Sequence, residues 1–293
     1  MATFNDWLEG ARLRTLPAAI APVLIGIGAA HFLGGFSAAR SVLALAVALA
    51  LQVGVNFSND YSDGVRGTDA VRSGPPRLTG GGKTSPKVVL AAALGCFALA
   101  GVLGLVLLYI SSQWWLLVPG VAAVAAAWFY TGGRTPYGYM GVGLSELFVF
   151  VFFGLMATVA TTWVQIQVAP WWLWCGAAGT GMLSVALLFV NNIRDIPTDS
   201  KTGKRTLPVR LGDRLSRFVY AWLLGIGVVM TGLGLVRTRF VPAYLLVFAA
   251  PVLLISRRVL AGAKGRELLP ILRNTGFLTL FTGLAVCIGL AVS

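Results

Sequence analysis

The stretch LQVGVNFSNDYSDGVRGTD, residues 51–69, begins in a long apolar run and ends in polar residues. It contains the pattern N-x-x-x-D, formed by Asn56 and Asp60. A spacing of four residues puts two side chains on the same face of a helix. Asp63 is an i+3 neighbour of Asp60 on that helix. We therefore expect these polar side chains at the end of an apolar helix.

A second stretch, LLFVNNIRDIPTDSKTGKR at 187–205, has the same layout. Asn191 and Asp195 repeat the N-x-x-x-D pattern, and Asp199 continues that helical face by one more turn. The likeness predicts two related halves with one further helix added. We expect residues 1–293 to form a single membrane-embedded domain.

The composition is that of a membrane protein. The chain is 57% hydrophobic and 11% charged, with a mean hydropathy of +0.81, whereas a soluble domain carries about 25% charged residues. The net charge of +13 could suggest a nucleic-acid partner. However, the basic residues sit in short loops between apolar runs, so they are interpreted as topology and lipid signals, and no nucleic acid is expected.

Nine runs are apolar enough to cross a membrane, which takes about 20 residues in a helix. Small residues recur within them, as in GAAGTG at 176–181, and they allow the close helix contacts that stabilise bundles in lipid. The expected fold is an all-α integral membrane bundle of nine transmembrane helices. The runs are residues 16–33, 41–58, 88–109, 114–130, 141–163, 171–193, 218–236, 240–256 and 271–291.

The loops predict how these helices are oriented. Basic residues collect at the N terminus, in every second loop and at the foot of the last run; of the 23 Lys and Arg only Arg40, Arg237 and Arg239 lie elsewhere. The positive-inside rule puts the basic side in the cytoplasm, with the N terminus inside and the C terminus outside. All 10 acidic residues lie on that side or at adjoining ends of the runs. We expect a multi-pass protein of a bacterial plasma membrane whose active site faces the cytoplasm.

Other common kinds of site are not indicated. Cys96, Cys175 and Cys287 lie in separate apolar runs without CxxC spacing, so they are interpreted as packing residues. The one histidine, His31, stands alone, whereas metal ligands come in clusters. The first apolar run lacks a small-residue cleavage site and continues into a full span, so no cleavable signal peptide is predicted.

Gathered carboxylates repel one another and are unfavourable at a membrane surface unless a positive charge lies between them. One such cluster alone would usually be a helix cap or a turn, but two matched clusters on one side favour a site. Mg²⁺ suits it, because this ion binds one or two carboxylates together with substrate phosphates, whereas zinc, copper and iron favour His or Cys. Surrounding cations favour a metal-bridged diphosphate over a bare cation site. They are Arg66, Arg72, Arg77, Lys83, Arg194, Lys201, Lys204 and Arg205.

The loop FYTGGRTPYGYMGVGLSE faces the same side and carries Tyr130, Tyr137 and Tyr139. These tyrosines fit either an aromatic belt at the membrane interface or rings that stabilise a developing carbocation. Glu146 lies inside the fifth apolar run, so it needs a partner such as Arg134 or a polar cavity.

These residues carry a resemblance to a known family. The chain is similar to the UbiA superfamily of intramembrane prenyltransferases, and most similar to its menaquinone branch. Its first motif departs from the family's longest form, N-D-x-x-D-x-x-x-D, because position 67 is Gly; Asp69 is the candidate to substitute. The stretches that carry the resemblance are RLRTLPAAIAPVLIG (12–26), NFSNDYSDGVRGTD (56–69), GPPRLTGGG (74–82), YTGGRTPYGYMGVGLSELFVFVFFG (130–154) and NNIRDIPTDSKTGKRTLPVRLG (191–212).

The resemblance implies that two Mg²⁺ ions bridge the substrate diphosphate. The implied metal ligands are Asn56, Asp60, Asp63, Asn191, Asp195 and Asp199, within which the paired N-D-x-x-D and D-x-x-x-D motifs fall. The implied catalytic residues are Asp60, Asp63, Asp195, Asp199 and Tyr139. The implied substrate- and diphosphate-binding residues are Arg14, Asn59, Arg66, Arg77, Lys83, Arg134, Tyr137, Asn192, Arg194, Lys204 and Arg205.

The implied reaction transfers a polyprenyl group from polyprenyl diphosphate to 1,4-dihydroxy-2-naphthoate. Diphosphate and CO₂ leave, and demethylmenaquinone forms. Arg134, Lys204 and Arg205 would neutralise the leaving group, because charge develops on its bridging oxygen. Arg14 is either an anchor for the acceptor carboxylate or a topology signal. The isoprenoid tail is expected in an apolar groove that opens laterally to lipid.

Three alternatives remain open. A UbiA-type enzyme could use another acceptor, such as 4-hydroxybenzoate, homogentisate, haem or a sugar phosphate. A secondary transporter also combines related halves with acids inside the membrane, although here the acids gather at one face and the span centres are uncharged. A lipid phosphotransferase is disfavoured, because its D-G-x-x-A-R type of signature is absent from the sequence.

Overall fold

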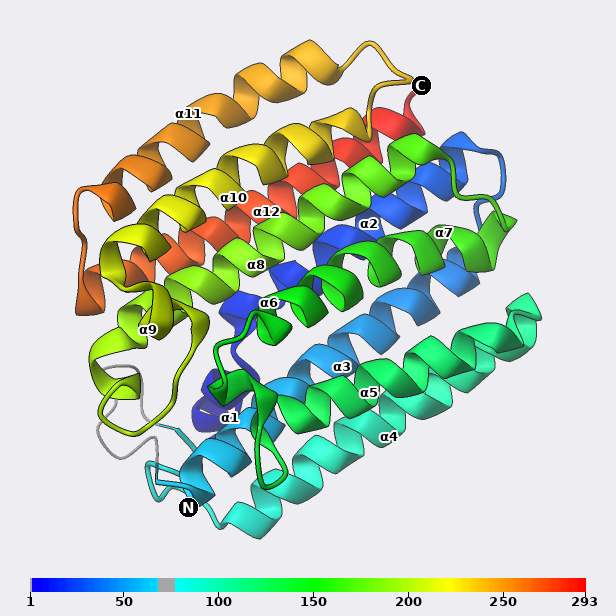
Figure 1. Ribbon diagram of the computed structural model, residues 1–293. Helices are drawn as coiled ribbons and strands as arrows, with labels where there is room; N and C mark the ends of the chain where they lie inside the picture. Colours follow the sequence, from blue (N-terminus) through cyan, green and yellow to red (C-terminus); the bar gives the residue numbers. More distant parts are fainter. Residues whose placement is uncertain (1, 68–76) are drawn as a thin grey trace.

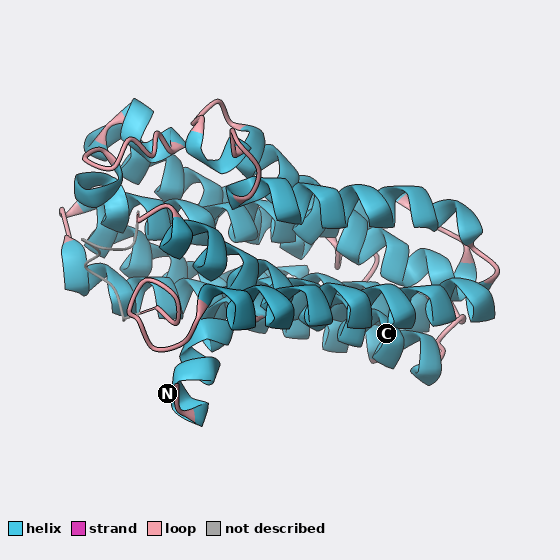
Figure 2. Cartoon of the chain, turned by 90° about the horizontal axis from the view of Figure 1, so that it is seen from below, coloured by secondary structure: helices cyan, strands magenta, loops and turns pink. Residues whose placement is uncertain are grey.

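The computed structural model describes residues 2–67 and 77–293, and within these ranges every regular element is a helix (Figures 1 and 2). Asp69, Arg72 and the first residues of the GPPRLTGGG stretch lie outside them. The elements are α1 (Phe4–Ala11), η1 (Leu13–Thr15), α2 (Pro17–Phe32), α3 (Ala38–Val65), α4 (Pro86–Ser111), η2 (Trp114–Leu116), α5 (Leu117–Thr131), η3 (Tyr137–Tyr139), α6 (Leu144–Val149), η4 (Phe150–Met156), α7 (Ala157–Ile166), α8 (Trp171–Asp199), α9 (Leu207–Leu211), α10 (Asp213–Leu233), α11 (Val241–Leu260), η5 (Gly265–Glu267) and α12 (Leu268–Ala291).

The membrane bundle predicted from hydropathy is confirmed. Within the described ranges, 8 helices are long and apolar enough to span a membrane, and a ninth span results if α2 is counted with the preceding segment, from which it bends by 52°. Large apolar side chains cover the outer helices: Val118 on α5 is 75% exposed and Leu246 on α11 is 80% exposed. Apolar surface of this extent belongs in lipid rather than in water.

Local sequence signals account for several helix starts. Thr3 and Asp6 form a reciprocal capping box at the start of α1. The hydroxyl of Ser37 accepts from the backbone N–H of Arg40 at the start of α3. Proline occupies the first turn of α2 and of α4, where its missing N–H leaves no hydrogen bond unmade.

Two helices extend further than the apolar runs that predicted them. The run 41–58 becomes α3, which continues to Val65, and the run 171–193 becomes α8, which continues to Asp199. The helical hydrogen bonds continue past the point where hydropathy falls, because packed polar side chains can support further turns. The aspartates therefore stand within the last turns of these helices, not in loops beyond them.

The span at Leu144–Ile166 is not a uniform α-helix. Its middle segment, η4, is a π-helix over seven residues, a conformation that is often found at functional sites. Gly154 in η4 lies so close to α8 that a Cβ on it would come within 2.5 Å of the Cα of Gly181. Small residues on both helices thus permit this contact.

Helix α8 is the centre of the bundle. It packs against α2, α10, α12 and η4, and it is the most buried of the spans. Figure 1 shows α8 between the layer of α10 and α12 and the layer of α6 and α7. The ends of α3 and α8, helix α9 and the loop with η3 lie at one end of the bundle, near the N terminus, whereas the C terminus lies at the other end (Figure 1). Both acidic clusters therefore share one end.

The contact between α2 and α12 depends on a glycine. A Cβ on Gly283 would come within 2.8 Å of the Cα of Ala21, whereas a Cβ on Gly95 of α4 would meet nothing within 4 Å. We expect Gly283→Ala to destabilise the protein by about 1–3 kcal/mol, because overpacking moves backbones apart. Gly95→Ala should leave stability unchanged or raise it slightly, because alanine favours the helix. Thermal unfolding midpoints in one detergent measure both effects; equal midpoints for the two variants would contradict this account.

Candidate active site

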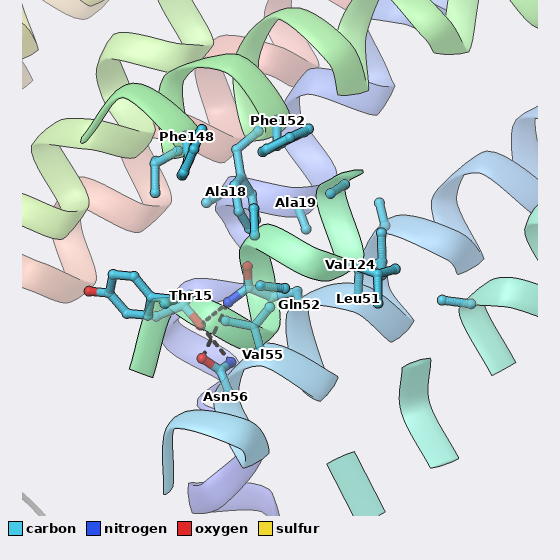
Figure 3. Close-up of a pocket in the computed structure, with 18 of the residues that line it drawn as sticks. Thr15, Ala18, Ala19, Leu51, Gln52, Val55, Asn56, Val124, Phe148 and Phe152 are labelled. Atoms are coloured by element: carbon cyan, nitrogen blue, oxygen red, sulfur yellow. Dashed lines mark hydrogen bonds between the residues drawn. The ribbon is translucent and has the colours of Figure 1, made fainter. Parts of the chain in front are cut away.

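A cavity of about 890 Å³ lies between α2, α3, α4, α5, η4 and α8. At one end it is lined by polar and charged side chains from α3 and α8, and the remainder is mainly apolar, with residues such as Val121, Leu116 and Leu108. Figure 3 shows part of its lining, where helices that are distant in sequence face one another. The cavity therefore combines a charged end with a long apolar interior.

The α3 wall carries a fully buried carboxylate. Asp60 accepts hydrogen bonds from the backbone N–H groups of Leu78 and Thr79, at 3.0 and 2.8 Å. The neighbouring Asn59 accepts a hydrogen bond of 2.8 Å from the hydroxyl of Thr131 at the end of α5. These bonds satisfy buried polar groups and attach the residue 77–79 segment and α5 to the end of α3.

Asp63 joins three loops. Its carboxylate accepts a short hydrogen bond from the Tyr139 hydroxyl, and it lies 4.0 Å from Arg77 Nη2 and 3.7 Å from Lys204 Nζ. The Lys204 ammonium also lies 5.0 Å from the centre of the Tyr139 ring, within range of a cation–π interaction. Asp63 is only 3% exposed, so these partners compensate a buried charge.

The α8 wall carries a second charged cluster. Arg194 forms a bidentate ion pair with Asp195, with Nε–Oδ1 and Nη2–Oδ2 distances of 2.8 and 2.6 Å. The same guanidinium donates to Oδ1 of Asn191 at 3.0 Å. The backbone carbonyl of Asp199 accepts from the N–H of Lys204, which starts the return of the chain toward α9. The fork geometry orders this helix end.

Twelve of the residues that the sequence nominated line this one cavity. They come from η1, from the ends of α3 and α8 with the segments that follow them, and from η3, so residues far apart in the chain are brought together. They are Arg14, Asn56, Asn59, Asp60, Asp63, Arg77, Tyr137, Asn191, Asn192, Arg194, Asp195 and Lys204.

The other nominated residues do not line the cavity. Lys83 forms an ion pair with Asp6 of α1, outside the cavity lining. Arg66 donates to the backbone carbonyl of Gly133. A sequence indicates on which side of the membrane a basic residue lies. Which groups its side chain contacts depends on how the loops fold. The nominated residues outside the lining are Arg66, Lys83, Arg134, Tyr139, Asp199 and Arg205.

The tyrosines take distinct places. Tyr130 and Tyr137 line the cavity, whereas Tyr139 contacts Asp63 from beside it. The Tyr137 hydroxyl donates to the backbone carbonyl of Ala126 at 2.8 Å, and burial raises the pKa of this phenol well above its usual value. Tyr137 thus stays protonated at neutral pH.

Glu146 does not pair with Arg134, which was one of the two arrangements expected for it. Its Oε1 is buried and makes no hydrogen bond within the described part of the chain, and Arg134 is exposed rather than paired with it. The reason is that Arg134 lies in the turn after α5, while Glu146 stands in the first turn of α6. The positive end of that helix favours an acid at this position.

The donor atoms of the two clusters suit a hard cation. Carboxylate and amide oxygens from α3 and α8 face one cavity, and these are the ligand atoms that Mg²⁺ takes. Among residues 2–67 and 77–293, no three His, Cys, Asp or Glu side chains are grouped closely enough to hold a metal by themselves. Mg²⁺ commonly completes its shell with water and substrate phosphate oxygens, so the residues fit an ion that binds together with a phosphorylated ligand.

Several cavity residues were not anticipated from the sequence. They include Thr15, Gln52, Phe148 and Phe152. Gln52 could have been found, because it lies one turn before Asn56 and extends the same i, i+4 face of α3. The phenylalanines could not, because their apolar run has aromatic residues on all sides and the π-helix selects which of them face inward.

Comparison with known proteins gives a consistent result. A family model described as the UbiA prenyltransferase family matches residues 19–290. A 1,4-dihydroxy-2-naphthoate octaprenyltransferase of Mycobacterium tuberculosis is 48% identical over 292 residues, which cover 99% of this chain and 98% of the relative. The enzyme of the same description from Escherichia coli is 33% identical, with 98% and 95% coverage.

Solved structures share the fold. A UbiA homologue from Aeropyrum pernix, without ligand, superposes with a TM-score of 0.70 at 15% identity and covers 100% of this chain and 99% of its own. A UbiA homologue from Archaeoglobus fulgidus, described as bound to GPP and Mg²⁺, gives a TM-score of 0.69 at 16% identity and covers 98% of this chain and 100% of its own.

The contacts of Asp63 predict a local effect on the loops. Asp63→Asn should release the Lys204 and Tyr139 loops, because a hydrogen bond to a charged group contributes about 1.5–3 kcal/mol. We expect trypsin to cleave after Lys201 and Lys204 at least about tenfold faster than in the wild type. Asp6→Asn, which removes an acid on the surface helix α1, is the matched control and should leave these cleavage rates unchanged. Unaltered rates in Asp63→Asn would show that Asp63 does not hold the loops.

Proposed function

The chain belongs to the UbiA prenyltransferase family, and from this membership we propose that it transfers a polyprenyl group from polyprenyl diphosphate to 1,4-dihydroxy-2-naphthoate. Relatives that match nearly its whole length carry that description. The products would be diphosphate, CO₂ and the quinol form of demethylmenaquinone. The whole chain, residues 1–293, would act as one membrane-embedded domain in menaquinone biosynthesis.

The observation that carries the proposal is the shape and chemistry of one cavity. Its charged end brings together Asp60, Asp63 and Asp195 with Arg77 and Lys204, while its interior is apolar. A polyprenyl diphosphate has the same division, because a highly charged head is joined to a long hydrocarbon tail. Burial of the tail is favourable by about 25 cal/mol per Å² of apolar surface. A soluble acid or sugar would leave the apolar interior unfilled.

The chain's own residues suit the departure of diphosphate. Lys204 and Arg77 lie at the charged end, where they would stabilise the negative charge that grows on the leaving oxygen. Both electrons of the broken carbon–oxygen bond leave with the diphosphate, and a ring carbon forms the new bond to the allylic carbon. The electron pair that held the carboxylate stays with the ring as CO₂ departs. The rings of Tyr130 and Tyr137 would stabilise positive charge on the prenyl group.

We propose that Mg²⁺ is the cofactor, held by Asp60, Asp63 and Asp195 with nearby amide oxygens. When bound, this ion would neutralise the diphosphate and make it a better leaving group. Asp60 and Asp195 each have oxygens already engaged, with backbone N–H groups and with Arg194 respectively. A carboxylate oxygen has a second lone pair, so these bonds would orient the acids toward a ligand.

The acceptor is proposed from the relatives and from Arg14. This residue lies at the start of the α2 span and lines the cavity, so its guanidinium could bind the naphthoate carboxylate. Other aromatic acids, such as 4-hydroxybenzoate and homogentisate, are the competing acceptors. A transporter is disfavoured by the position of the acids, which stand at one end of the bundle rather than at its midplane.

The two acidic helix ends give the sharpest test of catalysis. Asp60→Asn and Asp195→Asn should each lower prenyl transfer by at least about a hundredfold, because each removes charge stabilisation of the leaving group. The measurement is product formation from a polyprenyl diphosphate and the naphthoate, with Mg²⁺ and with EDTA. Glu267→Gln, at the same end but away from the cavity, should retain activity. Full turnover by both aspartate variants would exclude the proposed site.

We also propose that the site faces the cytoplasm of a bacterium, with the N terminus inside and the C terminus outside. The excess of basic residues on that side supports this orientation. Alkaline phosphatase, which is active only outside the cytoplasm, should be active when fused after Ser293 and inactive when fused after Lys201. The reverse pattern would invert the topology without changing the proposed reaction.

A further inference from the structure

A small polar cluster interrupts the apolar wall of the cavity. It consists of Thr15, Gln52 and Asn56, and Figure 3 shows it beside the apolar side chains of α2 and α3. Gln52 and Asn56 are 6% and 2% exposed. Buried polar groups of this kind are normally hydrogen-bonded in full, so any acceptor left over is informative.

The hydrogen bonds determine how each amide is oriented. The Asn56 Nδ2 donates to the backbone carbonyl of Ala11 at 2.8 Å, and this carbonyl can only accept. The Oδ1 of Asn56 is therefore the atom that meets Gln52, at 3.4 Å, so the facing atom of Gln52 must be its Nε2. That Nε2 also donates to the Thr15 hydroxyl at 3.0 Å. Thr15 in turn donates to the backbone carbonyl of Arg12 at 2.9 Å.

One acceptor remains after this assignment. Within the described residues, the Oε1 of Gln52 accepts no hydrogen bond, and Gln52 lines the cavity. Opposite the cluster, across the cavity, stand the rings of Phe148 and Phe152 (Figure 3). A ligand between these two surfaces would meet aromatic faces on one side and a single hydrogen-bond acceptor on the other.

We propose that Gln52 recognises a hydroxyl group of the aromatic acceptor. This inference rests on the proposed function, and it assigns a residue to the binding of the aromatic substrate that receives the prenyl group. The free Oε1 accepts the hydroxyl proton, while Phe148 and Phe152 contact the ring by aromatic packing. A carboxylate could not bind there, because it has no proton to donate to Oε1. Gln52 therefore selects phenolic over purely acidic acceptors.

The position of Gln52 suits this role. It precedes Asp60 by eight residues on α3, which places it about 12 Å further along the helix axis. The diphosphate end lies at Asp60, so the ring would stand beyond the reacting allylic carbon and inside the cavity. A hydrogen bond accepted from the phenol also increases electron donation into the ring, which favours attack by a ring carbon.

The cluster also gives Asn56 a role. Its Oδ1 accepts from Gln52 and its Nδ2 is bound to Ala11 and Thr15. Asn56 is thus a positioning residue, which holds the Gln52 amide with its oxygen toward the cavity.

The test compares Gln52→Met with the wild type on matched ligands. The ligands are 1,4-dihydroxy-2-naphthoate and its two monohydroxy analogues, which lack one hydroxyl each. One of the two analogues lacks the hydroxyl that Gln52 recognises. For the wild type, the inhibition constant of that analogue should be about tenfold higher than the KM of the dihydroxy acceptor. For Gln52→Met, the KM of the dihydroxy acceptor should rise about tenfold, while the inhibition constant of that analogue stays within about twofold of wild type. The KM for polyprenyl diphosphate should not change.

Two further variants separate recognition from stability. Gln52→Glu keeps an oxygen acceptor and should preserve the discrimination between ligands. Gln165→Met removes another buried glutamine, whose Oε1 accepts from Ser37 and Ser41 away from the cavity. It should lower the unfolding midpoint and leave the discrimination unchanged.

The outcomes distinguish this inference from the proposed function. If Gln52→Met weakens the dihydroxy acceptor and both analogues equally, or weakens none of them, Gln52 does not recognise a hydroxyl. If the wild type prenylates none of the aromatic acceptors, the proposed function itself is wrong.

Discussion

A carboxylate that is buried where protein meets membrane must be compensated, and much of this structure follows from that requirement. Asp60 is fully buried and is held by two backbone N–H groups. Asp63 draws in the loops of Tyr139 and Lys204, and Asp195 is bound by its neighbour Arg194. Each acid therefore organises the chain around it, because an uncompensated charge would be strongly destabilising in this environment. The loops at this end of the bundle are held in place because they supply the partners of these buried carboxylates.

The same arrangement leaves capacity for a ligand. Carboxylates whose positions are already set by backbone and guanidinium groups need little rearrangement when a charged molecule binds. The packing of small residues around α8 and the π-helix η4 keeps the opposite wall of the cavity in place. The charged end and the apolar interior therefore belong to one cavity. The membrane around the bundle provides a hydrocarbon environment that matches the apolar interior.

The helices of the structure agree with those predicted from the sequence. The contacts made by the charged side chains of the loops could not be predicted in the same way. The apolar runs located every span, and the paired N-x-x-x-D patterns identified residues that do line one cavity. Charge counting could not separate Lys204, which contacts Asp63, from Lys83, which pairs with Asp6 on the surface. Both lysines lie in basic loops on the same side, and only the path of each loop decides which acid it meets. The i, i+4 spacing places Gln52 on the helix face of Asn56 and Asp60, but only the fold shows that its amide lies in the wall of the cavity.

By itself, the sequence determined that the chain is a helical membrane bundle, where its spans lie and which polar residues stand on each helix face. These properties depend on hydropathy and on the 3.6-residue period, which are local. Only the tertiary structure decided that the faces of α3 and α8 meet across one cavity, that Asn56 binds Ala11 and Thr15, and that the oxygen of Gln52 is left to face the interior. Those facts depend on contacts between segments far apart in the chain, and no local pattern encodes them.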